Sequence, residues 1–173
     1  MSPSRWRGCA LTLPSTESEF GEFGEIGMRT ARRRAREIAL QAVYAWQLAG
    51  GGTPEVLAQA QGLEGYARAD AGLADALIRG VIERADQLDA LIAPHLIDRR
   101  LDQLSPVERA ILRIGTLELA AHPETPVKVV LNEAVDLGKA FGAEQGHRFV
   151  NGVLERVAQA VRPGEFARLR QTA

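Results

Sequence analysis

Residues 31–48 read ARRRAREIALQAVYAWQL, and this stretch decides the fold class. Its apolar side chains recur with the period of about 3.6 residues that is typical of an amphipathic helix. They are Ala35, Ile38, Ala39, Ala42, Val43 and Trp46. Three consecutive glycines, Gly50 to Gly52, end the pattern. The stretch therefore predicts a helix over residues 31–48 that buries one side, with Trp46 in the core.

The same period and recognisable start signals predict further helices along the chain, about seven in all. The expected ranges are 54–60, 70–84, 86–95, 105–121, 125–141 and 144–161. Ser105 and Glu108 have the spacing of a capping box, and Thr53-Pro54 and Thr125-Pro126 are N-terminal signals of the same kind. Residues 127–131 are rich in β-branched side chains, yet their apolar positions keep the helical spacing, so we predict helix there.

Composition agrees with an all-helical fold and limits what the chain can do. In its 173 residues, 46% are hydrophobic but only 5% aromatic, which favours packed helices over a β-sandwich. The 21 basic and 22 acidic residues exclude a uniformly basic coat for nucleic acid, but they allow a local basic patch. We expect an all-α protein of two small packed bundles, at about residues 30–98 and 99–162.

The small number of cysteines and histidines and the lack of long apolar runs exclude several classes of protein. Cys9 is the only cysteine, so an intrachain disulfide and a cysteine-based zinc site are excluded. The three histidines follow no metal-ligand spacing, and no apolar run approaches the roughly 18 residues that span a bilayer. These observations predict a cytoplasmic protein with no membrane segment, no metal and no cofactor.

Residues 1–28 differ in composition from the rest of the chain. They mix Ser, Pro, Gly and Glu with isolated large residues and show no sustained period, which predicts a disordered N-terminal extension. Arg5 and Arg7 precede an apolar segment that is too short for a signal peptide. The helical pattern starts directly after Met28, so translation from either Met1 or Met28 fits the sequence.

Arginines crowd the start of the first predicted helix, at Arg29, Arg32, Arg33, Arg34 and Arg36. Cations are unfavourable at a helix N-terminus because of the helix dipole, unless an anion is bound nearby. Guanidinium groups bind phosphate in a bidentate manner, so the run indicates a nucleic-acid site. The alternative is a solvated basic face or a frayed tail.

Two aromatic residues stand close to basic side chains. Tyr44 lies on one helical stripe with Arg33, and it could stack on a base, anchor a protein partner, or pack on a neighbouring helix. His147, Arg148 and Phe149 offer two donors and an aromatic ring near a predicted helix start, as a small surface for single-stranded RNA does. The alternative for these three is a core edge with N-terminal capping.

Recognisable catalytic motifs are missing from the sequence. It has no glycine-rich phosphate loop, no nucleophile elbow and no His-Glu-x-x-His motif. Asn132 and Glu133 fit a structural hydrogen bond across the bundle better than a catalytic role. A binding protein is therefore favoured over an enzyme.

Taken in order, these stretches resemble the NusB family of bacterial transcription antitermination factors. The resemblance is carried by residues 31–48, 108–114, 126–143 and 149–154, and it spans nearly all of residues 30–162. Residues 1–28 match nothing that we associate with the family, and residues 52–70 match it only loosely. At Gln145 and Gly146 some relatives carry Asp-Ser, so a carboxylate expected near the RNA edge is missing here.

The resemblance implies an all-helical fold of two bundles without catalysis or cofactor. It also implies binding to the boxA sequence of nascent ribosomal RNA, together with the small-subunit ribosomal protein that acts as NusE. This pair works within the RNA polymerase antitermination complex, which reads through terminators in ribosomal RNA operons. The implied RNA face comprises Arg32, Arg33, Arg34, Arg36, Arg148 and Phe149. The implied partner face comprises Tyr44, Asp102, Glu108 and Arg113.

Two further interpretations stay open at this point. A similar helical domain begins some ribosomal RNA cytosine methyltransferases, so the chain could be an RNA-binding fragment of such an enzyme. A catalytic cysteine and a methyl-donor domain would have to follow it, and this chain has only Cys9. The third interpretation is a homodimeric helical scaffold, since some relatives self-associate.

Overall fold

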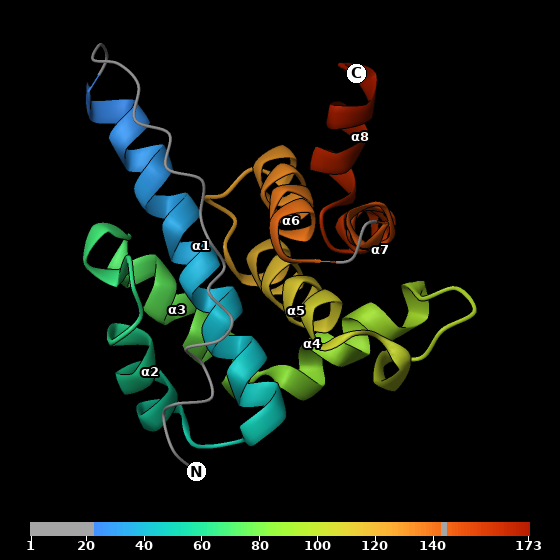
Figure 1. Cartoon of the computed structure of the whole chain (residues 1–173). Helices are drawn as coiled ribbons and strands as arrows, with labels where there is room; N and C mark the ends of the chain where they lie inside the picture. Colours follow the sequence, from blue (N-terminus) through green and yellow to red (C-terminus); the bar gives the residue numbers. More distant parts are fainter. Residues whose placement is uncertain (1–22, 143–144) are drawn as a thin grey trace.

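The computed structural model describes residues 23–142 and 145–173, and the regular structure in those residues is entirely helical (Figure 1). The all-α prediction is therefore confirmed. The helices are α1 (Phe23–Ala49), α2 (Thr53–Gln61), α3 (Ala71–Glu83), α4 (Ala85–Ile92), α5 (Pro106–Ala121), α6 (Val127–Phe141), α7 (Gly146–Val161) and α8 (Pro163–Gln171). Short 3₁₀ turns lie at Tyr66–Arg68, Ala93–His95 and Leu101–Gln103.

The two ends of the described chain contain more helix than predicted. Helix α1 already begins at Phe23, so residues 23–28, which were predicted to be disordered, are helical; residues 1–22 lie outside the described part. Helix α8 was not predicted, since the last expected helix ends at residue 161 and Pro163 follows it. Pro163 instead occupies the first helical position, where proline is favoured because no backbone N–H is needed there.

Two of the three predicted helix starts differ in detail from the structure. The capping box at Ser105 is confirmed: Ser105 Oγ accepts from the Glu108 amide at 3.1 Å, and Glu108 Oε2 accepts from the Ser105 amide at 3.2 Å. Thr53 is the first residue of α2, and its N-cap is Gly52 without a side-chain hydrogen bond. Similarly, α6 starts after Pro126 rather than at Thr125. Residues 127–131 are helical, as their spacing predicted.

Helix α5 is the central element of the fold. Its side chains are buried over most of its length, including Ile111, Leu112, Ile114, Leu117 and Leu119. It packs against α1, α3 and α4 on one side and against α6 and α7 on the other, so it must be apolar on more than one stripe. The buried apolar residues of both predicted bundles belong to one core around α5. The division near residue 98 stays a prediction.

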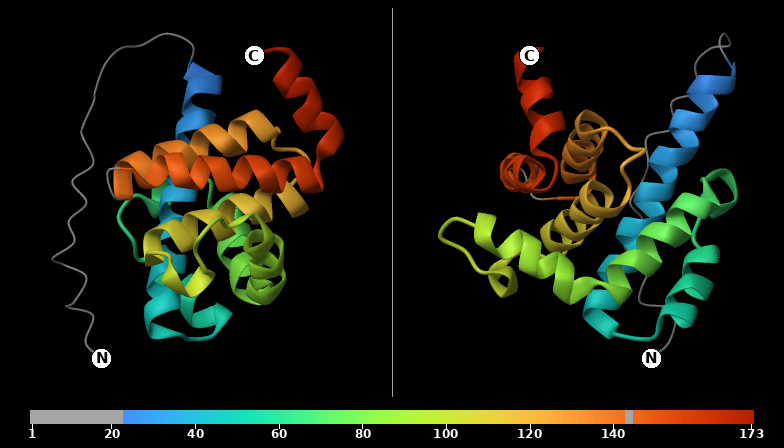
Figure 2. Two further views of the ribbon diagram at one scale, coloured as in Figure 1. Left: turned by 90° about the vertical axis from the view of Figure 1, so that its right-hand side faces the viewer. Right: turned by 180° about the vertical axis from the view of Figure 1, so that it is seen from behind.

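Helices α6 and α7 lie side by side across α5, as the left view of Figure 2 shows. Gly138 allows this close approach, because a Cβ atom at that position would lie 2.9 Å from the Cα atom of His147. The contact is with backbone, so a side chain at position 138 could not be accommodated by a rotamer change. The absence of a side chain at Gly138 therefore allows the start of α7 to pack against the second half of α6.

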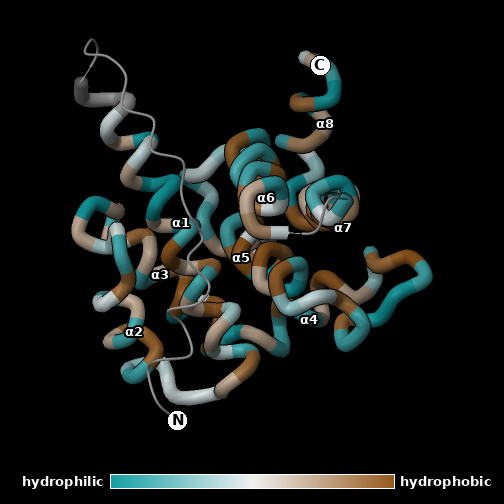
Figure 3. Tube along the Cα trace, viewed as in Figure 1, coloured by the Kyte–Doolittle hydropathy of each residue, from teal (hydrophilic) through white to brown (hydrophobic). Residues whose placement is uncertain are grey.

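Hydrophilic and hydrophobic residues alternate along most of the helices (Figure 3), as expected for helices that bury one stripe. Within the described residues, no helix is both long and apolar enough to cross a membrane.

Candidate nucleic-acid and partner interfaces

The arginine run lies where α1 meets α6 and the turn before it. Arg33 is exposed, and its Nη2 lies 3.3 Å from Asp136 Oδ2 on α6, while its Nε lies 3.9 Å from Glu37 Oε1. Arg32 is half-buried and donates from Nη2 to Thr125 Oγ1 at 3.3 Å. Arg34 is also half-buried. Three of the four predicted RNA-binding arginines in this run therefore have at least part of the side chain at the surface.

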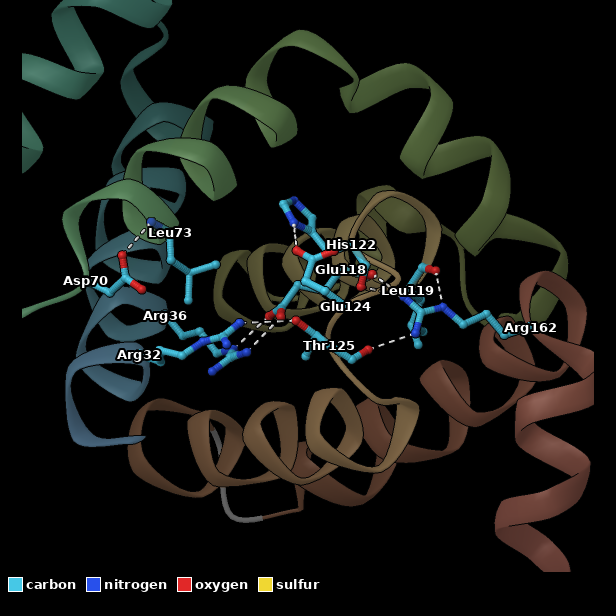
Figure 4. Close-up of polar contacts among 10 residues, drawn as sticks. All are labelled: Arg32, Arg36, Asp70, Leu73, Glu118, Leu119, His122, Glu124, Thr125 and Arg162. Atoms are coloured by element: carbon cyan, nitrogen blue, oxygen red, sulfur yellow. Dashed lines mark hydrogen bonds and ion pairs between the residues drawn. The ribbon is translucent and has the colours of Figure 1, made fainter. Parts of the chain in front are cut away.

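Arg36 requires a correction, because its guanidinium group points into the protein. Its side chain is 3% exposed, and it donates from Nε and Nη2 to the two carboxylate oxygens of Glu118, each at 2.8 Å (Figure 4). A direct contact with RNA is incompatible with this placement. The sequence did contain a signal: Arg36 precedes the buried residues Ala39, Leu40 and Val43 by three, four and seven positions, which is the spacing of one helix face.

Carboxylates crowd this arginine-rich edge. Burial is the main cause that raises the pKa of Glu133 and that of Glu37 above the usual value, although nearby arginines act in the opposite direction. Glu133 Oε2 is buried and has no hydrogen-bond partner among the described residues. The predicted hydrogen bond from Glu133 across the bundle is thus not formed by this oxygen. The two glutamates reduce the positive charge that the arginines present.

The turn between α5 and α6 is held from both sides by arginines (Figure 4). Arg162 lies just before α8 and donates to the carbonyl oxygens of Glu118, Leu119, His122 and Thr125, at 2.7–2.8 Å. It thereby supplies a donor to the Leu119 carbonyl, whose helical donor is missing because residue 123 is proline, and a second donor to the Glu118 and His122 carbonyls, which also accept backbone N–H groups. The Thr125 hydroxyl accepts from Arg32 on the opposite side. Sequence reasoning missed Arg162, because its partners lie about forty residues earlier in the chain.

The second candidate RNA-binding group lies at the start of α7. Arg148 is exposed, while Phe149 is half-buried and packs against the core. The Arg99 guanidinium carbon lies 4.8 Å from the centre of the Phe149 ring. Phe149 therefore lies at an edge of the core with a cation next to its ring, and its role in RNA binding stays a prediction.

Helix α6 connects the two groups. Asp136 on α6 contacts Arg33 of α1, and Gly138, two positions further along, contacts His147 of α7. The arginine run and the start of α7 thus meet at the same end of α6. Lys139 is exposed at this end as well, and sequence reasoning did not select it. The fold brings together positive charges that are separated by more than a hundred residues in sequence.

The four predicted partner-binding residues divide into two kinds. Tyr44 is half-buried on α1, and Asp102 is exposed and paired with Arg100 at 3.1 Å. Glu108 is only 8% exposed and completes the capping box, and the Arg113 side chain is 11% exposed. Glu108 and Arg113 are therefore largely buried in structural contacts, and their place on the partner face stays a prediction.

Arg113 joins α1, α4 and α5 beneath the predicted partner-binding residues. Its Nε and Nη2 donate to the two carboxylate oxygens of Asp89 at 2.8 and 2.7 Å, and its Nη1 donates to Gln47 Oε1 at 3.0 Å. Gln47 also donates to the Pro106 carbonyl at 2.8 Å, which joins the end of α1 to the start of α5. Trp46, which was predicted to lie in the core, is half-buried, and the Arg113 guanidinium carbon lies 5.7 Å from the centre of its ring.

No cluster of three or more His, Cys, Asp or Glu side chains able to hold a metal occurs among the residues that the structure describes. The fold and these groups define a small all-helical protein with an arginine- and phenylalanine-containing surface at one end of α6 and a second, tyrosine-containing surface on α1. The NusB family model matches residues 33–159. The chain belongs to the NusB family.

Named relatives resemble the chain over most of its length. A transcription antitermination protein NusB of Dechloromonas aromatica is 42% identical over 161 residues, which cover 93% of this chain and 98% of the relative. The NusB protein of Burkholderia cenocepacia is 48% identical over 137 residues, which cover 79% of this chain and 94% of that protein. An alignment of 161 residues in a chain of 173 must extend into residues 1–28, so the expectation that none of them matches a relative is wrong.

Solved structures agree with the family assignment. A NusB structure from T. maritima superposes with a TM-score of 0.69 at 30% identity, and covers 79% of this chain and 96% of that one. A crystal structure of antitermination factors NusB and NusE in complex with dsRNA gives a TM-score of 0.68 at 29% identity, over 77% of this chain and 99% of its counterpart.

Proposed function

We propose that this chain is a transcription antitermination factor that binds boxA RNA in nascent ribosomal RNA transcripts together with a NusE-type ribosomal protein. In this role it promotes read-through by RNA polymerase in ribosomal RNA operons. The observation that carries the proposal is the similarity, over 77% of the chain, to a protein solved together with NusE and dsRNA.

The arrangement at the end of α6 suits a single RNA strand. Arg33, Arg34 and Arg148 supply permanent positive charge for phosphates, because a guanidinium group stays protonated. Phe149 supplies an aromatic ring on which an unpaired base can stack. Arg32 helps to position this surface through its hydrogen bond with Thr125. Arg36 supports the surface from the interior, because it holds α1 against α5.

The partner surface lies around Tyr44 and Asp102. Tyr44 offers an amphipathic ring, a residue type enriched at protein interfaces, and Asp102 offers negative charge to a basic ribosomal protein. Glu108 and Arg113 support this surface through the capping box and the Asp89–Gln47 network rather than through direct contact.

A binding role without catalysis or cofactor, in the cytoplasm where transcripts are made, follows from this function. The relatives are named as antitermination proteins, and the match covers 98% of one such relative. A fragment of a ribosomal RNA methyltransferase is therefore not favoured. The homodimeric scaffold is a separate alternative, which the size of the chain in solution with and without the NusE-type protein tests.

Titration of fluorescent boxA RNA tests the proposal, with the chain alone, with the NusE-type protein alone, and with both. We expect weak binding by the chain alone and much tighter binding by the pair, with a strong decrease in affinity as salt is raised. An RNA of scrambled sequence is the control. Equal affinity for the boxA and scrambled RNAs, or no effect of the second protein, would contradict the proposed function.

A further inference from the structure

The loop between α4 and α5 places a cation on the aromatic ring of the candidate RNA surface. The sequence predicted only a boundary between two bundles near residue 98. In the structure this loop projects from the body of the protein (Figure 1), and Arg99 is exposed with its guanidinium carbon 4.8 Å from the centre of the Phe149 ring. Arg99 comes from a different segment than either predicted group of RNA-binding residues.

Contacts on both sides of Arg99 hold the loop in this position. Arg156 of α7 donates from Nε and Nη2 to the His95 carbonyl at 3.1 and 2.8 Å, which ties the start of the loop to α7. Asp98 has a φ of 58°, a left-handed conformation that is uncommon for residues other than glycine. Arg100 forms two 3.1 Å hydrogen bonds with Asp102 in its own segment. The two adjacent arginines therefore point to different partners.

The Phe149 ring is half-buried because it packs against the core, and the Arg99 guanidinium group lies over the ring. A base that stacks on the face of Phe149 that Arg99 covers must take the place of this group. Stacking of a base on an aromatic ring is stronger than an exposed cation–π contact, so the base can take the place of the guanidinium group. The displaced guanidinium group then lies next to the incoming nucleotide, whose phosphate it can bind in a bidentate manner.

We propose that Arg99 is a further RNA-binding residue that covers Phe149 in the unbound protein and pairs with an RNA phosphate when a base stacks on that ring. This inference rests on the proposed function, because it concerns the same RNA surface. It assigns a role to the α4–α5 loop, which becomes a third segment of the surface beside α1 and α7. It also makes the exchange at Phe149 specific for single-stranded RNA, since a paired base cannot reach the ring.

Arg99→Gln tests this role, and Arg100→Gln is the matched control, because it removes the same charge one residue away. Both variants are titrated with boxA RNA in complex with the NusE-type protein at several salt concentrations. We expect Arg99→Gln to weaken binding by about five- to tenfold and to reduce the salt slope by about 0.7, the value for one phosphate contact on a single strand. Arg100→Gln should change the affinity less than twofold. Equal effects of the two variants, or no effect of Arg99→Gln, would overturn the proposal.

The NMR signal of the Arg99 Nε–H group gives a second readout that does not depend on affinity. In the unbound protein the Phe149 ring current should shift this signal upfield, and Phe149→Leu should remove the shift. Addition of RNA to the wild-type complex should move the signal downfield as the guanidinium group leaves the ring. A signal that keeps its shift in the RNA complex would overturn the exchange. Failure of the wild-type pair to bind boxA RNA would instead contradict the proposed function itself.

Discussion

Arg36 on α1 and Glu118 on α5 form an ion pair inside the protein, with both hydrogen bonds at 2.8 Å and side chains only 3% and 2% exposed. Burial acts to lower the pKa of the Arg36 guanidinium group, but hydrogen bonding and attraction from Glu118 outweigh it, and the pKa is raised. The Arg36 guanidinium group therefore stays charged. It fixes the helix that carries the surface arginines to the central helix of the fold.

Removal of one partner of this pair should destabilise the protein strongly. Arg36→Met leaves the Glu118 carboxylate buried without its cation, which typically costs about 3–5 kcal/mol. Urea unfolding followed by circular dichroism measures the loss. The double variant Arg36→Met/Glu118→Leu should recover most of the stability, because two apolar side chains replace two charges. A loss below about 1 kcal/mol for Arg36→Met would show that Glu118 finds another partner or water.

Arg162 should be a second key residue for stability, although it lies near the end of the chain. Arg162→Ala leaves the carbonyl groups of Leu119 and Thr125 without their arginine donor, and it removes the second donor from those of Glu118 and His122, which also accept backbone N–H groups. We expect a loss of about 2–4 kcal/mol, since each unsatisfied buried acceptor costs about 1–3 kcal/mol and water can replace part of the contacts. Arg162→Lys keeps the charge but not the planar set of donors, so its melting temperature should fall between those of the wild type and Arg162→Ala. Equal stability of all three would mean that the α5–α6 turn needs no cap.

Most of the fold could be predicted from local sequence, because its helices have strong periodicity and clear start signals. Helix α5 shows this best: Ser105, Pro106 and Glu108 define its start, and the structure has the same capping box. Helix α8 shows the limit. Proline both ends and begins helices, and only the contacts of Arg162 and Glu165 with the α5–α6 region and the start of α6 reveal which role Pro163 has.

The site could be predicted only in outline, since exposure depends on tertiary contacts. Arg33 pairs at the surface with Asp136, whereas Arg36 is buried against Glu118; the helical spacing of Arg36 from Ala39, Leu40 and Val43 indicates its buried side, but not its partner. Arg99 was missed for the same reason, because its partner Phe149 lies fifty positions later in the chain. Contacts of this length have no signature in the local sequence.

Glu133 should make stability depend on pH. Its pKa is raised mainly by burial, so the folded state binds a proton more tightly than the unfolded state does. Its contribution to stability is therefore lost as pH rises from about 4.5 through the raised pKa. Glu133→Gln should unfold at a higher urea concentration than the wild type at pH 7, and this advantage should shrink as pH falls toward 4.5. An advantage that does not change with pH would show that Glu133 does not titrate in this range.

Two substitutions at the α1–α6 contact should change RNA affinity in opposite directions. Arg33→Gln removes an exposed cation and should weaken RNA binding several-fold, with a smaller salt slope. Asp136→Asn removes the carboxylate 3.3 Å from Arg33, so it should strengthen binding, because the guanidinium group no longer has a competing anion. Both positions are exposed enough that melting temperatures should change little. If the affinity falls in both variants, the Arg33–Asp136 pair itself is needed to shape the surface.

The last prediction separates the partner surface from its structural support. Tyr44→Asp places a charge on the half-buried ring position of α1, so binding of the NusE-type protein should fall at least tenfold, while weak RNA binding by the chain alone persists. Tyr44→Phe keeps the ring and is the control, with affinity within about threefold of the wild type. Glu108→Ala removes half of the capping box, which should cost about 0.5–2 kcal/mol of stability but change partner affinity less than Tyr44→Asp does.

Calorimetric titration with the NusE-type protein, together with melting curves of the same samples, distinguishes the outcomes. If Tyr44→Asp melts like the wild type but does not bind the NusE-type protein, Tyr44 lies in the contact with that protein. Normal partner binding combined with loss of RNA binding would mean that the two surfaces are assigned the wrong way round. Unfolding of Tyr44→Asp at room temperature would show that Tyr44 belongs to the packing of α1. A Glu108→Ala variant that keeps its stability yet loses the partner would contradict the structural role of Glu108, and would place its 8% exposed carboxylate in the interface.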